Sequence, residues 1–350
     1  MKAATAASRM RTVTALYQFC FYVPVRVFVS SSLRGTFRRL SVLSEQIAEG
    51  DPRAIARGIS AVEDDPVAGA ELVRELFGRA GRAYLVGVTG APGAGKSTLV
   101  DALVAAWRNG GKTIGVIAVD PTSPYSGGAM LGDRVRMQAH AGDQGVFIRS
   151  MATRGHLGGL ARATSDAALV LDAAGKDVVI VETVGVGQDE VDIIRTADVS
   201  IVVLVPGMGD EVQALKAGIM EIADIFVVNK CDREGADRTA AEIESLLSLQ
   251  AFEVGEWTPP IVRTEATKGS GVSQVIDAVD RFRAHSATKL ASRRRSRAAA
   301  QLRAILADRL MTRVESKTGG ADLEQAIDRI AARQMDPYTA ADEILEGEHE

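Results

Sequence analysis

The sequence predicts an α/β fold with a doubly wound, mostly parallel sheet, and two observations lead to this prediction. Short apolar runs alternate with helical patterns along most of the chain, as they do in repeated β–α units. A glycine-rich loop also joins the first apolar run to a helical pattern, an arrangement common in nucleotide-binding sheets. The apolar runs lie at residues 84–88, 113–119, 146–148, 178–181, 199–205, 225–228 and 261–262.

Residues 1–43 are expected to be a disordered or leader-like segment. This stretch is rich in Arg, Ser and Ala and holds no acidic residue, a composition typical of a mitochondrial transit peptide. A start codon placed too early is the alternative. The apolar run 13–29 is interrupted by Pro24 and Arg26 and is short for a membrane span. We therefore expect a cytoplasmic protein, or one of the mitochondrial matrix if residues 1–40 are a true transit peptide.

Residues 44–82 are predicted to form an N-terminal helical extension, and residues 83–286 the α/β domain. Apolar residues recur at helical spacing in the extension and indicate two amphipathic helices that pack on the edge of the domain. These residues are Ile47, Ile55, Ile59 and Val62, followed by Val67, Leu72, Val73, Leu76 and Phe77.

Residues 287–350 are predicted to be helical, because the strand-like runs stop there. The arginine-rich stretch 293–297 leads into a helix with one apolar face, and two shorter helical patterns follow. An amphipathic helix outside the core needs another surface to cover its apolar side. We therefore expect a dimerisation arm and a homodimer. The apolar face comprises Leu302, Ile305, Leu306 and Leu310.

Charge and cysteine content exclude several classes of protein. The chain of 350 residues has a formal net charge of -4, and its basic first 44 residues leave roughly -11 for the remainder. A body this acidic argues against nucleic acid as the main partner. Cys20 and Cys231 are the only cysteines, too few for a disulfide framework or a zinc site, and a reducing compartment fits best.

The loop after the first apolar run predicts a phosphate-binding loop, or P-loop, and hence a P-loop NTPase fold. Its glycines let backbone N–H groups curl around phosphates, the following helix N-terminus adds partial positive charge, and Lys96 neutralises the β/γ oxygens. Ser97 is then placed to ligate Mg²⁺. The loop reads Gly90-Ala91-Pro92-Gly93-Ala94-Gly95-Lys96-Ser97-Thr98.

Carboxylates follow two other predicted strands. Asp120 ends the second apolar run, and Asp133 lies beyond Gly127-Gly128. Such a carboxylate can reach the metal or a water near the γ-phosphate; helix capping by Asp120 and Asp133 is the alternative. Glu182 follows the apolar run 178–181, where an ionised side chain is costly unless it faces a metal and its waters.

The stretch Asn229-Lys230-Cys231-Asp232, which closes another predicted strand, indicates guanine. A carboxylate at Asp232 can accept from both N1–H and N2–H₂ of guanine, whereas adenine offers no matching pair of donors. The predicted ligands are therefore GTP and GDP. Thr264-Glu265-Ala266, after the last strand, is expected to offer the backbone N–H of Ala266 to the guanine O6.

From about Ser44 to the C-terminus, these residues resemble a known family. It comprises SIMIBI-class P-loop GTPases that chaperone adenosylcobalamin-dependent acyl-CoA mutases, called MeaB after methylmalonyl-CoA mutase and also labelled ArgK. The most specific matching stretches are Val119-Asp120-Pro121-Thr122-Ser123, Ser126-Gly127-Gly128, Leu131-Gly132-Asp133-Arg134, Thr153-Arg154-Gly155, Leu157-Gly158-Gly159 and Glu182-Thr183-Val184-Gly185-Val186-Gly187-Gln188.

The resemblance implies roles for particular residues. Ser97, Asp120, Asp133 and Glu182 would form the shell of Mg²⁺ and its waters, with Gly185 beside the nucleotide. Lys96, Asp120 and Glu182 are the expected catalytic residues. The terminal helices would be a dimerisation arm. The implied function is a GTPase that gates cobalamin loading and protects a mutase such as methylmalonyl-CoA mutase.

The sequence also departs from related patterns. Val186 stands where Ras-like proteins carry the water-orienting glutamine, so Asp120 is the candidate to position the attacking water, and slow hydrolysis is expected. Ala91 replaces the lysine of ATPases that act across a dimer, so that mechanism is not transferred. Glu265 replaces the serine usual in the loop at the guanine O6.

Three other functions remain as alternatives. A nickel-enzyme metallochaperone needs clustered Cys and His ligands, but the four histidines are scattered along the chain. An ATPase of an amino-acid transport system is disfavoured by Asp232 and by the lack of membrane spans in the sequence. A binding module that does not hydrolyse its nucleotide also stays open. The histidines are His140, His156, His285 and His349.

Overall fold

The computed structural model describes residues 31–120, 140, 142–152, 159–183, 194, 196–207, 222–250, 252–253, 255–318 and 321–346. Most of the segment predicted to be leader-like lies outside this description. Residues 43–350 form one compact unit, and the contacts reported below lie within it. None of the helices in the described part of the chain combines the length and apolar character that crossing a membrane requires.

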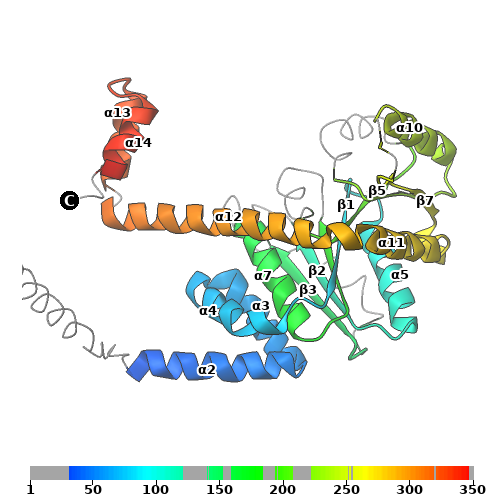
Figure 1. Cartoon of the computed structure of the whole chain (residues 1–350), viewed down its shortest axis with the longest axis horizontal. Coiled ribbons are helices and arrows are strands. Elements are labelled where there is room, and N and C mark those ends of the chain that lie inside the picture. Colours follow the sequence, from blue (N-terminus) through cyan, green and yellow to red (C-terminus); the bar gives the residue numbers. More distant parts are fainter. Residues whose placement is uncertain are drawn as a thin grey trace, which may run out of the picture. The chain divides into compact units, whose positions relative to one another are not determined.

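The elements follow one another as Figure 1 shows. Before the sheet lie α2 (Ser31–Ala48), α3 (Pro52–Asp64), α4 (Pro66–Leu76) and η1 (Phe77–Arg79). The sheet region comprises β1 (Tyr84–Gly90), α5 (Lys96–Asn109), β2 (Ile114–Asp120), β3 (Val146–Ala152), α7 (Gly159–Ala173), β4 (Val178–Thr183), β5 (Val199–Leu204), β6 (Ile225–Asn229), α10 (Ala236–Ser248), β7 (Ile261–Thr264), η4 (Ala266–Lys268) and α11 (Val272–Ser286). The C-terminal region holds η5 (Ala287–Lys289), α12 (Leu290–Thr318), α13 (Ala321–Ala331) and α14 (Pro337–Glu346).

The seven strands pair in parallel throughout, in the order β3-β2-β4-β1-β5-β6-β7. The doubly wound fold is therefore confirmed, and the described sheet is entirely parallel rather than mostly parallel. From β1 the chain builds one half of the sheet with β2, β3 and β4, and the other half with β5, β6 and β7. Because parallel strands all end at the same edge, the loops after β1, β4, β6 and β7 can meet there.

Several strands run beyond their apolar cores. β4 continues to Thr183 and β6 to Asn229, each past the last apolar residue. Backbone pairing decides where a strand ends, and this pairing includes polar residues: Glu182 is in register with Val88, and Asn229 with Thr264. The strand ends therefore place polar side chains directly at the edge where the P-loop lies.

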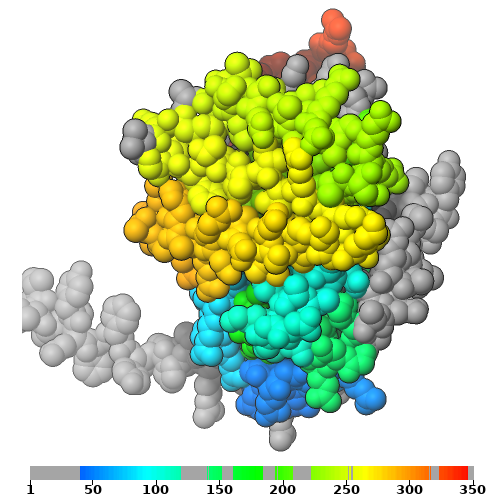
Figure 2. Space-filling view, turned by 90° about the vertical axis from the view of Figure 1, so that its right-hand side faces the viewer, coloured from blue at the N-terminus to red at the C-terminus, as the bar shows by residue number. Residues whose placement is uncertain are grey.

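Helices cover both faces of the sheet. On one face α5 and α11 pack together over β1, β4, β5 and β6, around a core that includes Leu99, Leu103 and Phe282. On the other face α3, α4 and α7 pack over β2, β3 and β4. Figure 2 shows α11, in yellow and orange, crossing the surface between α10 above and α5 below. Burial on both faces explains why the strands read as unbroken apolar runs.

Three helices precede the sheet where the sequence predicted two. Ile47 lies in α2, which ends before Gly50, a glycine with a φ of 81° that an L side chain rarely adopts. Asp51 then caps α3 by accepting a hydrogen bond from the N–H of Ala54, and Pro52 occupies the first helical position. Helical backbone also begins at Ser31, within the segment predicted to be disordered or leader-like.

The first turns of α12 are attached to the sheet. Arg297 donates to the Asp198 carboxylate at 2.5 Å and to the carbonyl of Thr196 at 2.8 Å. Arg293 pairs with Asp224 at 3.3 Å. Asp198 precedes β5 and Asp224 precedes β6, so both ion pairs lie at the edge of the sheet opposite the P-loop. The first turns of α12, within the predicted arm, are thus bonded to the domain that carries the sheet.

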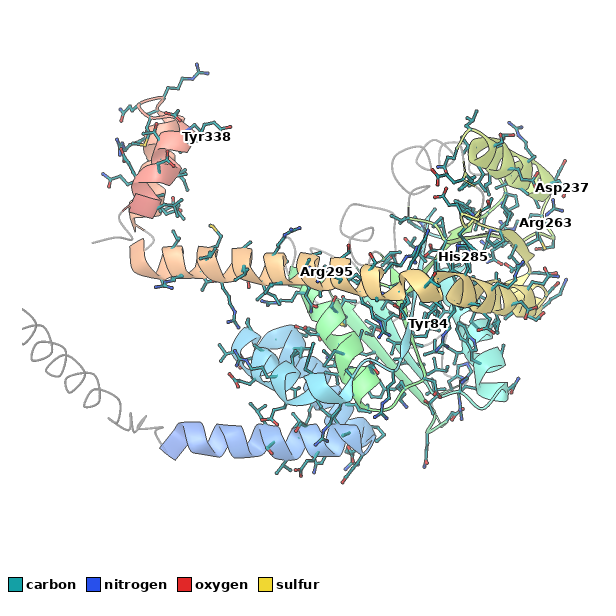
Figure 3. All side chains as sticks on the ribbon, viewed as in Figure 1. Tyr84, Asp237, Arg263, His285, Arg295 and Tyr338 are labelled. Carbon is teal, nitrogen blue, oxygen red and sulfur yellow. The ribbon has the colours of Figure 1, made fainter. Side chains whose placement is uncertain are left out.

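Further along, α12 carries exposed apolar side chains. Leu302, Leu306 and Leu310 are each at least half exposed, at fractions of 57%, 50% and 56%. Their spacing of four residues places them on one side of the helix. Tyr338, labelled on α14 in Figure 3, is also exposed, at a fraction of 84%.

Candidate nucleotide-binding site

Two glycines of the P-loop have a backbone conformation with positive φ. Gly90 has a φ of 143°, and a Cβ added there would collide with the carbonyl oxygen of Val203 on the neighbouring strand β5. Gly95 has a φ of 86° at the N-cap of α5, and its Cβ would lie 2.5 Å from Nδ2 of Asn229. Glycine is therefore required at both positions, for its backbone conformation and for the close approach of neighbouring strands.

Lys96 lies in the first turn of α5 and is buried. Its ammonium group donates hydrogen bonds to the carbonyls of Gly90 at 2.6 Å and Ala91 at 2.9 Å. These two bonds hold the ammonium group against the start of the P-loop. A cation in this position suits the β- and γ-phosphate oxygens of a nucleotide.

Ser97 and Glu182 are brought together from positions 85 residues apart. The hydroxyl of Ser97 donates to Oε1 of Glu182 at 2.6 Å. Glu182 is only 4% exposed, and it lies on β4 in register with Val88, two residues before the P-loop. The sequence had singled out both residues, and the structure places them side by side at the start of α5.

A pair of threonines behind the loop had no role assigned from the sequence, although Thr183 stands in one of the stretches that carry the family resemblance. Thr183 donates its hydroxyl to Oγ1 of Thr89 at 2.9 Å, joining the ends of β4 and β1 beneath the P-loop. Both side chains are buried. The available signal was their position: each threonine is directly next to a residue already assigned to the site, Gly90 or Glu182.

Asn229 joins the P-loop to the loop after β7. Its Nδ2 donates to the carbonyl of Ala94 at 2.9 Å. Its Oδ1 accepts from the hydroxyl of Thr264 at 3.0 Å and from the N–H of Ala266 at 3.2 Å. Asn229 is 2% exposed, so these bonds are shielded from water and hold the two loops in a fixed relation.

The remaining residues of the guanine motif surround this link. Lys230 has a φ of 55° and donates from Nζ to the carbonyl of Gly93 at 2.8 Å. The N–H of Cys231 donates to the carbonyl of Thr264 at 3.1 Å, and Asp232 is exposed. The N–H of Ala266, predicted to face the guanine O6, is bonded to Asn229 in this structure.

Glu265 and Lys268 form an ion pair beside Asp232. Lys268 Nζ lies 2.6 Å from Oε1 of Glu265. The pKa of Lys268 is raised above its usual range, first by this hydrogen bond and the charge of Glu265, and further by the negative charge of Asp232. The lysine is therefore within electrostatic reach of both carboxylates.

Some predicted site residues lie outside the described part of the chain. They are the side chain of Asp120, whose backbone ends β2, together with Asp133, Gly185 and Val186. The capping alternative for Asp120 and Asp133 falls outside it too. Within the residues that are described, His, Cys, Asp and Glu nowhere form a group of three that could hold a metal ion.

Comparisons with known proteins agree with this geometry. The family model of the methylmalonyl-CoA mutase-associated GTPase MeaB matches residues 52–319. A Pyrococcus abyssi protein named as a GTPase is 50% identical over 307 residues, covering 87% of this chain and 95% of the relative. A mitochondrial protein of Caenorhabditis elegans, named a methylmalonic aciduria type A homolog, is 39% identical over 210 residues, covering 59% of this chain and 53% of the relative.

A solved structure gives the same fold. The crystal structure of a LAO/AO transport system kinase has a TM-score of 0.67 and 26% identity, covering 89% of this chain and 98% of that chain. The fold, the nucleotide loops and the match across residues 52–319 lead to one assignment. The chain is a GTP-hydrolysing enzyme that binds guanine nucleotides, and it belongs to the family of the methylmalonyl-CoA mutase-associated GTPase MeaB.

Proposed function

We propose that this GTPase is a chaperone of an adenosylcobalamin-dependent acyl-CoA mutase such as methylmalonyl-CoA mutase, gating cobalamin loading and protecting the loaded enzyme. The observation that carries the proposal is the family match, which runs from residue 52, at the start of α3, through the nucleotide site to the end of α12. The name of the Caenorhabditis elegans relative points to the same metabolism.

Guanine recognition in this proposal depends on Asn229, Lys230 and Asp232. The Asp232 carboxylate accepts from N1–H and N2–H₂ of guanine. Lys230 is bonded to the P-loop and would lie beside a bound nucleotide, and Asn229 links the phosphate and base ends of the site. The N–H of Ala266, bonded to Oδ1 of Asn229 in the structure, is the proposed donor to the guanine O6.

Mg²⁺ is the metal that we propose for the phosphate end. The chain fits it there, because the Ser97 hydroxyl and the buried Glu182 carboxylate are hard oxygen donors directly beside the P-loop. Ser97, Asp120, Asp133 and Glu182 are the residues that would hold the ion and its waters. A bound Mg²⁺ neutralises charge on the β- and γ-phosphates.

The protein's own groups stabilise the phosphates and position the attacking water. Lys96, oriented by two carbonyls, stabilises negative charge on the phosphates, while the loop glycines present their N–H groups. Asp120, at the end of β2, positions the attacking water in place of the glutamine that Val186 replaces. Turnover without a partner is slow, and binding of the client accelerates it.

Assembly as a homodimer completes the proposal. We infer four regions along the chain, namely residues 1–43, the helical extension, the GTPase domain and the arm. The exposed leucines of α12 would be covered by a second copy, because an apolar stripe of this length favours burial.

The decisive experiment measures GTP turnover with and without a cobalamin-dependent mutase from the same source. The proposal expects the mutase to form a complex with this chain and to accelerate GTP hydrolysis. Asp120→Ala is the matched variant: it should bind GTP and the mutase but show no acceleration. No complex and no stimulation with any such mutase would overturn the chaperone role and leave the GTPase assignment intact.

A transport-system ATPase is the second candidate, favoured by the name of the solved structure. It predicts that ATP competes with GTP for the site. Competition binding with both nucleotides separates the two functions, because Asp232 offers adenine no matching donors and should exclude ATP.

A further inference from the structure

The strands β1 and β4 end next to each other beneath the P-loop. Their backbone register extends to Val88 opposite Glu182. The next residues along the two strands are Thr89 and Thr183, and the hydroxyl of Thr183 donates to Oγ1 of Thr89 at 2.9 Å. We call these two residues the threonine pair. The pair extends the connection between the strands by one position, up to the residue that begins the P-loop.

The threonine pair and Glu182 face opposite sides of the sheet, because side chains alternate along a strand. Ile180 belongs to the core on the α5 side, so Glu182 also faces α5, where it accepts the hydrogen bond from Ser97. Val181 belongs to the core on the α7 side, so Thr183 faces α7. The threonine pair therefore lies behind Glu182 and can influence the site through the backbone of β4.

Packing alone does not require hydroxyl groups at this position. Thr183 is fully buried and Thr89 is 2% exposed, on the side of the sheet where the surrounding core is apolar. Hydroxyl groups lose their bonds to water on burial, and replacing two bonded groups by apolar groups of similar shape can leave stability unchanged. Two valines would fill the same space, but they would not supply a directional bond that fixes the distance between the strand ends.

We propose that the threonine pair positions Glu182 at the phosphate end of the site: by joining the end of β4 to β1, it keeps the Glu182 carboxylate against the Ser97 hydroxyl. The inference rests on the proposed magnesium role of Ser97 and Glu182. Thr89 is followed by Gly90, whose carbonyl accepts from Lys96. A shift of β4 relative to β1 would therefore change the distance between the metal-binding oxygens and the ammonium group that stabilises the phosphates.

A purely structural role makes a different prediction. Thr183→Val leaves the Thr89 hydroxyl buried with one bond fewer, so it should lower the free energy of unfolding under either role. The double variant Thr89→Val/Thr183→Val removes both hydroxyls and should recover most of that loss. If the pair serves packing alone, the response of nucleotide binding to Mg²⁺ recovers together with stability. If the pair positions Glu182, stability recovers and the response to Mg²⁺ does not.

The test uses the full chain and calorimetric titration with a non-hydrolysable GTP analogue, with and without Mg²⁺. Thr183→Val and the double variant should bind the analogue like the parent chain when Mg²⁺ is absent. The affinity gained on adding Mg²⁺ should be about tenfold smaller than in the parent, the low end of the cost of removing a group that supports a metal ligand. Urea denaturation measures the stability of each variant.

Two further variants separate the hydroxyl bond from other effects of substitution. Thr183→Ser keeps the hydroxyl and should restore the response to Mg²⁺. Thr239→Val is the matched control, at a buried threonine of α10 whose hydroxyl bonds the carbonyl of Gly235, the N-cap of the same helix. It should respond to Mg²⁺ like the parent chain.

The outcomes distinguish this inference from the metal site on which it depends. A parental response to Mg²⁺ in Thr183→Val, or a response that recovers with stability in the double variant, would show that the pair serves packing alone. A reduced response that Thr183→Ser fails to restore would show that the hydroxyl bond is not the cause. If Ser97→Ala responds to Mg²⁺ like the parent chain, the proposed metal site fails and the inference with it.

Discussion

The carboxyl group of Asp166 on α7 should lower the free energy of unfolding of this protein at neutral pH. Burial raises the pKa of Asp166 from 3.8 to about 6, and the charge of Arg162, one turn earlier, offsets only part of that rise. In the unfolded chain the group ionises near the lower value. Between about pH 4 and pH 6 the folded protein therefore holds a proton that the unfolded chain has released.

The sign and size of the effect follow from linkage. The folded state binds more protons in this window, so the free energy of unfolding falls as pH rises from about 4 to about 6. Each pKa unit corresponds to about 1.4 kcal/mol, so Asp166 lowers the free energy of unfolding by up to about 3 kcal/mol at pH 7.5, where it is ionised, and by about 1 kcal/mol at pH 4.5, where the folded state keeps the proton.

Asp166→Asn removes this cost, because the amide keeps the shape of the side chain without its charge. The free energy of unfolding should rise by up to about 3 kcal/mol at pH 7.5 and by about 1 kcal/mol at pH 4.5. Urea denaturation at both pH values measures it, with Asp280→Asn at an exposed position of α11 as the control. A variant that is no more stable than the parent at pH 7.5, or a gain equal at both pH values, would refute the reasoning.

Three further predictions concern the site and the arm. Gly90→Ala should lower the free energy of unfolding by at least about 2 kcal/mol and abolish GDP binding, since its Cβ meets the Val203 carbonyl; urea denaturation and calorimetry check both. Ser97→Ala should keep most nucleotide affinity but lose the dependence of affinity on magnesium concentration, and unchanged dependence would argue against its ligand role. A chain ending at Ala300 keeps Arg293 and Arg297 and should melt near the parent temperature. A chain ending at Ala287 leaves Asp198 and Asp224 without these cations and should melt several degrees lower. Equal melting temperatures for both truncations, measured by calorimetry, would show that these ion pairs do not stabilise the domain.

Much of the fold could be predicted because its signals are local. The strands of a sheet covered on both faces read as apolar runs, and the glycines of the P-loop occur at a fixed spacing. Strand ends were less predictable: the polar residues Glu182 and Asn229 continue the backbone ladder, which depends on a neighbouring strand distant in sequence. The apolar pattern alone therefore ended these strands too early.

The links within the site were harder to predict for the same reason. Asn229 could be assigned to a guanine motif from the sequence, but its three hydrogen bonds involve partners 35 to 135 residues away. The attachment of the first turns of α12 depends on Arg293 and Arg297 meeting carboxylates that directly precede β5 and β6. Composition showed an arginine-rich run, which is usually solvated, and gave no indication of these partners.

The bridging position of Asn229 has a consequence for how the enzyme tells its substrate from its product. GTP and GDP carry the same base, so everything that Asn229 organises at the base end contributes equally to both. Its hydrogen bonds already exist in the folded chain, so a nucleotide need not order these loops when it arrives. Discrimination between the two nucleotides must then arise at the other end, where the Ser97 hydroxyl meets Glu182 and an additional phosphate changes the surroundings of a buried carboxylate. The site thus separates a common affinity, built into the scaffold, from contacts at the phosphate end that differ between the two nucleotides.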